Sequence, residues 1–271
     1  MSFKSGFLSS INKIGDDFSE VYRYRFVLYQ LIRQQLILRY RRTVFGYMWT
    51  LLNPLLMMSV TALVFSTIFK MDLKTYAVFL FAGMIPFTYF SQAVTQSGQS
   101  LIGNESLIKK IYIPKMVFPL ATSIALLVDS LLSAMALFII IFCIGGQVSF
   151  ALLIIPLCFF LLFLFSFGFA LIMAVCTTYF RDLQHVVGIL MQALLFLTPV
   201  FYKPDSLSGK VSSLIQINPL TPFIELFRAP IVNGQFPSVM ILGVTCLLGI
   251  LSSIFGLWFF RRCERDIAFR L

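Results

Sequence analysis

Charged residues are scarce in this chain: Asp, Glu, Lys and Arg make up 12% of its 271 residues, whereas hydrophobic residues make up 59%. A soluble domain carries roughly 25% charged residues and about 45–50% apolar ones. One water-soluble core cannot hide such an excess of apolar surface. The composition therefore predicts an integral membrane protein, for which lipid is much of the solvent.

Side chains that perform chemistry are also rare. His185 is the single histidine, and the five cysteines show no C-x-x-C spacing, which excludes the usual redox and zinc motifs. No group of His, Cys and carboxylate residues has the spacing of metal ligands. We therefore expect that the chain is not an enzyme, with no catalytic residue, no metal site and no cofactor of its own.

A phosphate-binding loop is missing too. The motif G-x-x-x-x-G-K-[ST] needs glycines that let backbone N–H groups wrap the phosphates and a hydroxyl that binds Mg²⁺. The nearest run, Ser208–Val211, has Pro204 where the first glycine should stand and Val211 in place of the hydroxyl. The chain is not expected to hydrolyse ATP itself.

Long apolar runs are present, and they predict an all-α fold. A membrane-spanning helix needs about 20 mostly apolar residues. Six segments qualify, at about 48–69, 76–100, 116–145, 150–180, 186–202 and 239–260. Residues 1–46 lack an early apolar run, so we expect no cleavable signal peptide and expect the first span to act as the targeting signal.

The placement of basic residues predicts the orientation. Sixteen of the 21 Lys and Arg residues lie in the N-terminal tail, the loop at about 101–115, the loop at Arg181 and the C-terminal tail. Because Lys and Arg are enriched in cytoplasmic loops, both termini are expected in the cytoplasm. This placement also argues that the net charge of +10 does not serve to bind nucleic acid.

The N-terminal segment at 22–45 has a helical pattern of moderate amphipathicity. Its apolar side carries Tyr24, Val27, Leu28, Leu31, Ile32 and Leu38. A helix lying in the headgroup plane fits this composition. We therefore divide the chain into a cytoplasmic tail with an amphipathic interface helix (1–46) and a six-span transmembrane domain (47–271).

The loop at about 104–115 predicts a short cytoplasmic helix. Asn104 is a candidate N-cap and Pro114 a candidate stop. Its apolar residues Leu107, Ile108, Ile111 and Tyr112 repeat along one face, whereas Lys109 and Lys110 point elsewhere. So short a helix is marginal alone, and we expect it to dock against another protein surface.

The external segment at about 203–238 holds apolar stretches too short to cross a membrane. Thr221 before Pro222 is typical of an N-cap followed by proline at the first helical position, and Gly234 is a candidate stop. Two short re-entrant helices dipping into the outer leaflet fit this pattern, because non-helical backbone at that depth must be shielded by protein.

Asp129 is the single acid deep inside a predicted span. Such residues are costly and raise the suspicion of a function. A protonated carboxyl, or one bonded to hydroxyls such as Ser130 and Ser133, is the structural alternative. It is favoured because a proton relay would need a second buried ionisable group.

Aromatic residues are abundant, with 31 Phe and 10 Tyr, and flat rings can stack on sugars as well as pack helices or face lipid. The candidates for lining a channel lie at the start of the first span and on the second and fifth spans. They are Tyr47, Trp49, Phe87, Tyr89, Phe90, Phe196, Phe201 and Tyr202.

The junction at 39–49 reads RYRRTVFGYMW and is followed by Leu52-Asn53-Pro54. It resembles the R-Y-R-x-[ST]-x-L-G-x-x-W signature of ABC-2 type transport permeases, in the branch that exports polysaccharides; Phe45 departs from the usual Leu. Further similar motifs follow in the same order along nearly the whole chain. They are Asn104 with Leu107–Lys110 and Pro114-Lys115, Arg181–Leu183, Thr198–Val200, and Asn218–Pro222.

The resemblance implies a homodimer in the bacterial inner membrane, with each subunit resting on a separate cytoplasmic ABC ATPase subunit that binds ATP and Mg. It implies that Asn104–Lys115 is a coupling helix seated in a cleft of the ATPase and that 22–45 is an interface helix. It further implies external gate helices, with Pro219, Pro222 and Phe223 as gate residues. The implied substrate is a polysaccharide of the O-antigen type on an undecaprenyl diphosphate carrier.

One hypothesis goes beyond the resemblance. Arg39, Arg41 and Arg42 lie where the interfacial helix meets the first span, at the depth of lipid phosphates. Guanidinium groups suit diphosphate oxygens, so these residues are candidates for holding the carrier headgroup. Ordinary anchoring to anionic lipid is the alternative.

Other functions stay open at this stage. A secondary transporter would be expected to carry paired broken spans and an ion site. An enzyme acting on lipid-linked sugars would need carboxylates or a metal at the leaflet boundary, which only Arg181-Asp182 approximates. Within the exporter class, teichoic acid, capsule and small-molecule substrates are alternatives.

Overall fold

The computed structural model describes residues 19–39, 48–144, 149–203, 215 and 217–270. These residues are almost all helical, and none of them forms a strand. The principal elements are α2 (Arg25–Arg39), α3 (Trp49–Phe69), α4 (Leu73–Ile102), α5 (Glu105–Lys110), α6 (Val117–Ile144), the 3₁₀ turn η2 (Phe150–Ile154), α7 (Ile155–Tyr179), α8 (Leu183–Leu197), α10 (Thr221–Ile231) and α11 (Val239–Arg270).

Each of the six predicted spans contains a helix, and four of these helices are long and apolar enough to cross a membrane. Among the described residues they are Leu73–Ile102, Val117–Phe142, Phe150–Tyr179 and Val239–Glu264. The other two apolar helices, Leu55–Phe69 and Leu183–Leu197, are shorter. The 15 residues of α8 rise only about 22 Å along the axis. A crossing by α3 and by α8 therefore stays a prediction.

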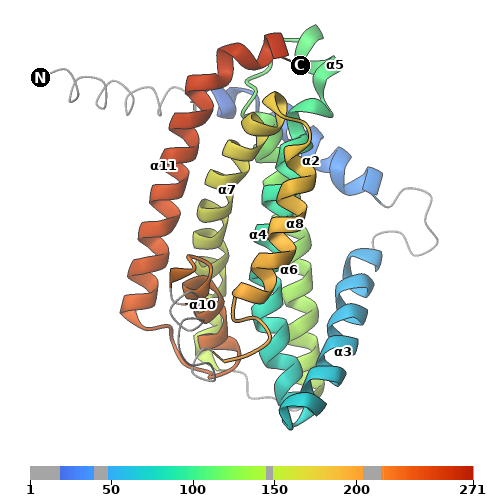
Figure 1. Cartoon of the computed structure of the whole chain (residues 1–271), viewed down its shortest axis with the longest axis vertical. Coiled ribbons are helices and arrows are strands. Elements are labelled where there is room, and N and C mark those ends of the chain that lie inside the picture. Colours follow the sequence, from blue (N-terminus) through green and yellow to red (C-terminus); the bar gives the residue numbers. More distant parts are fainter. Residues whose placement is uncertain (1–18, 40–47, 145–148, 204–214, 216, 271) are drawn as a thin grey trace, which may run out of the picture.

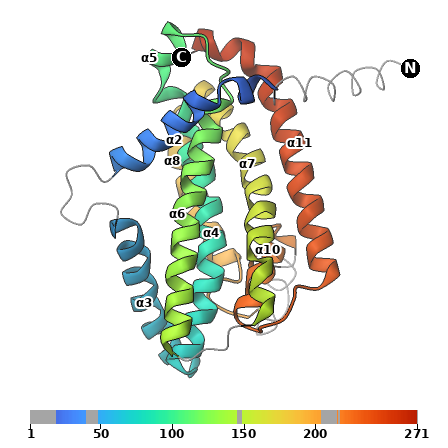
Figure 2. The same cartoon turned by 180° about the vertical axis from the view of Figure 1, so that it is seen from behind.

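The long helices lie side by side in one bundle, with α2 and α5 at one end and α10 near the other (Figure 1). Seen from behind, α2 crosses over the end of α6 (Figure 2). The C-terminal end of α11 reaches the same end as α5. We call these the α5 end and the α10 end of the bundle. The described parts of the predicted basic segments thus gather at one end, and a cytoplasmic orientation of that end stays a prediction.

Close contact between α7 and α11 is made possible by glycine. A Cβ atom on Gly168 would collide with the backbone carbonyl of Ser252, and one on Gly256 would collide with the carbonyl of Gly168. Ser253 donates a hydrogen bond of 2.7 Å to the carbonyl of Leu164 across the same interface. Small residues and serine hydroxyls commonly join helices in membranes in this way.

Helix α4 lies at the centre of the bundle and packs against α3, α6, α7, α8 and α10. Its first turn is capped by Asp72, which accepts a hydrogen bond of 3.1 Å from the backbone N–H of Thr75. Its 30 residues include Pro86 and rise about 45 Å, more than the hydrocarbon core needs.

The predicted interface helix begins at Arg25 and ends at Arg39 within the predicted range of 22–45. Leu31 is buried, and Val27, Leu28 and Ile32 pack with it against a cluster of buried apolar residues from α6, α7 and α11 at the α5 end of the bundle. Leu38, by contrast, is half exposed. The apolar side thus covers protein rather than lipid alone, because α2 packs on α6.

The last helix is longer than the predicted 239–260. It continues to Arg270, so the basic C-terminal tail is helical. Ile267 is fully buried in the cluster at the α5 end, and Lys115 donates a hydrogen bond to the carbonyl of Glu264. These contacts stabilise the extra turns and were not visible in a span defined by hydropathy.

Candidate functional site

The short helix between α4 and α6 exists, but it is shorter than predicted. It ends at Lys110 because Ile111 adopts an extended backbone, so Pro114 is not what stops it. Asn104 stands at the N-cap position without capping; its side-chain amide instead donates a bond of 2.8 Å to the carbonyl of Ser100.

The apolar residues of this segment divide into two pairs. Leu107 and Ile108 lie on the helix and are half buried against the bundle. Ile111 and Tyr112 follow the helix and are 56% and 75% exposed. The predicted continuous face on one helix is therefore wrong, and the exposed apolar surface belongs to the extended turn after the helix.

Two polar contacts with charged residues lie at or near this surface. Lys109 forms an ion pair of 2.6 Å with Glu105, and its hydrogen bond lowers the pKa of the Glu105 carboxyl. The Tyr112 hydroxyl donates a bond of 3.2 Å to Glu20, whose negative charge raises the pKa of Tyr112. The phenol is thus neutral at physiological pH and is held at the surface.

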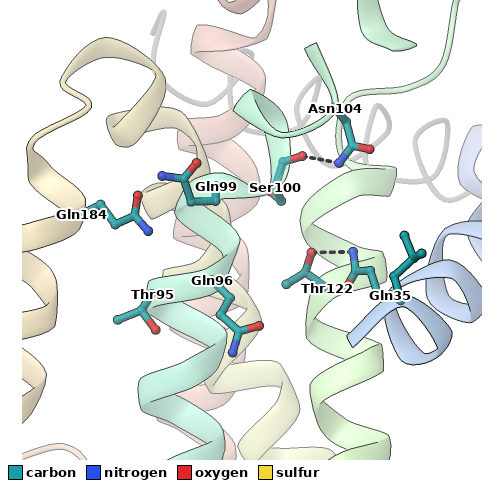
Figure 3. A pocket seen from close by; sticks show the side chains of 9 residues that line it. Gln35, Thr95, Gln96, Gln99, Ser100, Asn104, Thr122 and Gln184 are labelled. Atoms are coloured by element: carbon teal, nitrogen blue, oxygen red, sulfur yellow. Dashed lines mark hydrogen bonds between the residues drawn. The ribbon is translucent and has the colours of Figure 1, made fainter. Parts of the chain in front are cut away.

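A polar cavity of about 570 Å³ lies beside this helix, at the α5 end. Figure 3 shows Gln99 and Thr95 of α4 together with Gln184 of α8 on one side of it, and Thr122 and Gln35 on the other. The amide of Gln35 donates a bond of 3.0 Å to the Thr122 hydroxyl, which joins α2 to α6. The sequence motifs had not marked this cavity.

A second cavity, of about 310 Å³, lies farther along α4. Asp129, which is 9% exposed, belongs to its wall together with Trp49, Tyr89 and Gln92. The suspected acid is thus beside an open space and near other polar groups. Ser133 donates a bond of 3.0 Å to the backbone carbonyl of Asp129.

At the opposite end of the bundle, two motifs that are far apart in the sequence meet. The Asn218 amide donates a bond of 2.9 Å to the Thr198 hydroxyl, and its carbonyl oxygen accepts one of 3.0 Å from the N–H of Leu220. Helix α10 begins at Thr221 with Leu220 as its N-cap. Thr221 is therefore the first helical residue rather than the predicted cap, and its hydroxyl donates to the carbonyl of Ile215 at 2.7 Å.

Arg228 of α10 is the principal polar residue at this end that the sequence analysis missed. It is only 6% exposed, and its guanidinium donates to the carbonyls of Pro199 and Val200 at 2.6 and 2.7 Å. The same group lies 3.6 Å from the centre of the Phe79 ring. A signal was available, since Arg228 follows Ile224 by four residues and so shares the apolar face of its helix.

The predicted gate residues are distributed over this end. Phe223 is fully buried and stacks on Phe165 at 4.6 Å between ring centroids. Pro222 is half buried and Pro219 is exposed. Helix α10 ends at Ile231, before Gly234, which has a φ of +63° and whose carbonyl accepts a bond of 2.7 Å from Ser149. The first of the two predicted external helices falls largely outside the described residues, and a gate function stays a prediction.

The candidate channel aromatics differ in exposure. Phe87, Tyr89, Phe90 and Phe201 are buried, Trp49 and Phe196 are exposed, and Tyr202 is intermediate. Tyr89 and Trp49 both line the second cavity, whereas Phe90 stacks on Phe165. Tyr47 lies outside the described residues. A role in a channel stays a prediction for all of them.

The arginines proposed to hold a headgroup also stay a prediction. Arg39 is the last residue of α2, and Arg41 and Arg42 lie outside the described residues. Within the part of the chain that the structure describes, no three His, Cys, Asp or Glu side chains are grouped so that they could hold a metal ion. His185 is exposed in the first turn of α8.

Comparison with known proteins identifies the family. The family model described as ABC-2 type transporter matches residues 27–232, which include most of α2 and all of α5 and α10. The chain belongs to the ABC-2 type transporter family. The resemblance inferred from the motifs is thereby confirmed.

Named relatives of this ABC-2 transporter chain are similar over most of their length. An O-antigen export system permease protein RfbA of Klebsiella pneumoniae is 29% identical over 245 residues, covering 89% of this chain and 93% of the relative. One of Myxococcus xanthus is 28% identical, covering 80% and 85%. A polysialic acid transport protein KpsM of Escherichia coli is also 28% identical, covering 85% and 93%.

Proposed function

We propose that this chain is the membrane subunit of an ATP-driven exporter that moves a lipid-linked polysaccharide of the O-antigen type out of the cytoplasm. The family membership and the permeases named above support the transport of a polysaccharide. Two copies of the chain would work with two copies of a separate ABC ATPase subunit, and the α5 end would face the cytoplasm.

The observation that carries the proposal is the exposed apolar turn after α5. Ile111 and Tyr112 expose large apolar side chains at the end of the bundle, beside the basic residues Lys109 and Lys110. Lipid does not solvate this surface if it projects into the cytoplasm, so a protein partner is the natural cover. An ATPase subunit that binds this turn could move α4 and α6, because α5 and the turn together connect these two helices.

Contacts at the α10 end of the bundle support an export path that can be closed on the outer side of the membrane. Arg228 and Asn218 tie α10 to the turn that follows α8, so that a short helix and a short span move together. In an exporter this unit would cover the outer mouth. Such a role for α10 is part of the proposal.

Two other classes fit the structure less well. A secondary transporter would be expected to couple an ion through paired buried charges, whereas Asp129 is the single acid among the described residues of α4, α6 and α7. A lipid-sugar enzyme needs a reactive group at the leaflet boundary, and the residues that line the two cavities include a single carboxylate.

Deletion of the gene tests the proposal. We expect carrier-linked glycan to accumulate on the cytoplasmic side and surface glycan to disappear, with recovery when the wild-type gene is returned. Vesicles that contain the purified chain and its ATPase should take up glycan with ATP, and vesicles with the chain alone should not. Normal surface glycan in the deletion strain, or transport by the chain alone, would contradict the proposal.

A further inference from the structure

The exposed side of α4 is polar in a helix that crosses the membrane. Between Tyr76 and Ile102 the exposed side chains are Gln96 and Gln99. Among the four long helices that could cross a membrane, α4 has the lowest mean hydropathy, 1.5 against 2.3 to 2.8. Polar side chains that faced lipid would give up the hydrogen bonds that water offers, which is unfavourable.

Other helices show what a lipid-facing side looks like in this chain. On α11 the exposed side chains include Leu247, Ile250, Leu251 and Ile254. On α3 they include Leu56, Val60 and Leu63. The contrast indicates that the polar side of α4 faces an aqueous space rather than lipid.

This polar side continues along the helix as a stripe. Thr88, Gln92, Thr95 and Gln99 follow one another at spacings of four, three and four residues, which places them on one face of α4. The stripe joins the two cavities, because Thr88 and Gln92 line the one with Asp129, whereas Thr95 and Gln99 line the one at the α5 end.

Helix α6 carries a matching face. Thr122, Asp129 and Ser133 stand seven and four residues apart. Thr122 lines the cavity at the α5 end, whereas Asp129 and Ser133 line the second cavity. Both helices pack against each other. The two faces together form a polar track from the α5 end to the middle of the bundle.

The chemistry of the track is that of a polyhydroxyl ligand. Amide and hydroxyl side chains both donate and accept hydrogen bonds, as sugar hydroxyls do. The ring of Trp49 borders the second cavity, where it could stack on the apolar face of a sugar. Asp129 adds an acceptor for hydroxyl hydrogens at the inner end of the track.

The charge of the track restricts the ligand further. Among the described residues, no Lys, Arg or His lines either cavity, and the one carboxyl group in their lining belongs to Asp129. An anionic chain would meet no counter-charge among these lining residues, so the charges that it brings into the track would lack partners there. An uncharged chain brings no charge that needs a partner.

We infer that this track binds the hydroxyl groups of an uncharged glycan chain as it passes, and that it disfavours polyanionic glycans. The inference rests on the proposed export function and adds the charge class of the substrate. Relatives named for O-antigen and for polysialic acid are about equally identical to this chain, so overall similarity does not separate these substrates, whereas the charge of the lining does.

The first test uses the glycan that accumulates in the deletion strain. It is released from its carrier by mild acid, so that the diphosphate is removed, and is passed over an anion exchanger. We expect it to run through unretained. A retained glycan with an acidic sugar in each repeat would overturn the inference and leave the export function standing.

The second test changes the track itself. In the deletion strain, the variant Q96L/Q99L should lower surface glycan at least tenfold at an equal amount of chain in the membrane. The control Q235L changes an exposed glutamine near the α10 end and should export normally. Normal export by Q96L/Q99L would overturn the inference, whereas normal export by the deletion strain itself would instead overturn the proposed function.

A binding measurement separates a loss of binding from a defect in folding. The chain has two tryptophans, so W258F leaves Trp49 as the sole tryptophan reporter in the chain. The purified W258F permease is titrated with the isolated glycan, and with polysialic acid as the anionic probe. We expect a saturable fluorescence change with the glycan alone, weakened at least fivefold by Q96L/Q99L. An equal response to polysialic acid would overturn the inference.

Discussion

The guanidinium of Arg228 and the carbonyl of Val200 are joined by a hydrogen bond of 2.7 Å across 28 residues of sequence. The bond ties α10 to the turn after α8, and the neighbouring nitrogen of the same side chain holds the Pro199 carbonyl. A Cβ on Gly83 would come within 2.9 Å of this guanidinium, so α4 leaves just enough room for it. One arginine thereby connects α10 with α4 and with the turn after α8.

Replacing this arginine should destabilise the bundle. R228L removes two charge-assisted donors and leaves two buried carbonyls without them, so we expect the free energy of unfolding to fall by about 2–4 kcal/mol. R228K should recover part of the loss because it keeps one donor near the carbonyls. Thermal unfolding of the purified chain in detergent measures both.

The matched control is R33L, because Arg33 is exposed on α2. It should leave the unfolding temperature unchanged within about a degree, as most exposed substitutions do. If the R228L chain were as stable as the R33L chain, the carbonyls of Pro199 and Val200 would have found other hydrogen-bond donors.

The contact between α7 and α11 gives a prediction with a control at a second glycine, Gly243 of α11. G168A places a methyl group against the backbone of Ser252, so the helices must separate, at a cost of about 1–3 kcal/mol. Gly243 has open space around it, and G243A should be neutral or stabilising by up to about 1 kcal/mol, because alanine favours helix. Equal unfolding temperatures for the two variants would contradict the close packing.

The sequence predicted the helices well because hydropathy reports burial in lipid directly. Helix was found in all six apolar segments, and α4 and α6 agree with their predicted bounds to within three residues. The ends were less well predicted, because tertiary contacts decide them. Helix α11 continues to Arg270 because Ile267 is buried against other helices, and no local sequence pattern predicts that contact.

Local capping rules failed at the two short helices. Asn104 gives its amide to Ser100, and Thr221 gives its hydroxyl to Ile215, so neither caps the helix that follows. Helix α5 ends before Pro114 is reached, at a residue with extended backbone. A polar side chain near a helix end has several backbone partners within reach, and only the folded chain determines which one it takes.

The candidate site was predicted only in part, because some of its features depend on contacts between distant segments. Motifs placed the α5 segment, the turn after α8 and the start of α10, because each motif is contiguous in the sequence. The polar track needed the packing of α4 against α6, and Arg228 needed the position of carbonyls 28 and 29 residues away. Relationships of this kind depend on which faces meet in space.

Docking of an ATPase can be tested at the turn after α5. The double variant I111A/Y112A removes exposed apolar surface, so it should leave the stability of the chain unchanged and lower copurification of the ATPase subunit at least tenfold. F236A removes an aromatic side chain of similar exposure near the α10 end and should copurify normally. Full copurification by I111A/Y112A would place the ATPase contact elsewhere.

The arginines near the start of the first span carry a prediction made from the sequence. R39Q/R41Q should abolish export, because neutral amides bind diphosphate far more weakly than guanidinium groups do. Membrane insertion and copurification of the ATPase should be unaffected. R23Q, which changes an exposed arginine before α2, should export normally. Export by R39Q/R41Q would show that these arginines serve ordinary anchoring to anionic lipid.

Water access to the polar track can be measured with cysteine labelling. Q96C or Q99C is introduced into a chain whose five native cysteines are replaced by alanine or serine, and a membrane-impermeant thiol reagent is added to inside-out vesicles. Both positions should react, because their side chains are exposed on a polar face. L247C is also exposed, but on the apolar side of α11, and it should stay unlabelled because a thiol dissolved in lipid does not ionise. The inference would be contradicted if Q96C and Q99C were as unreactive as L247C. It would also be contradicted if they cross-linked to the same residue of a second copy instead of being labelled. In either case the polar face of α4 would be covered, and no glycan could pass along it.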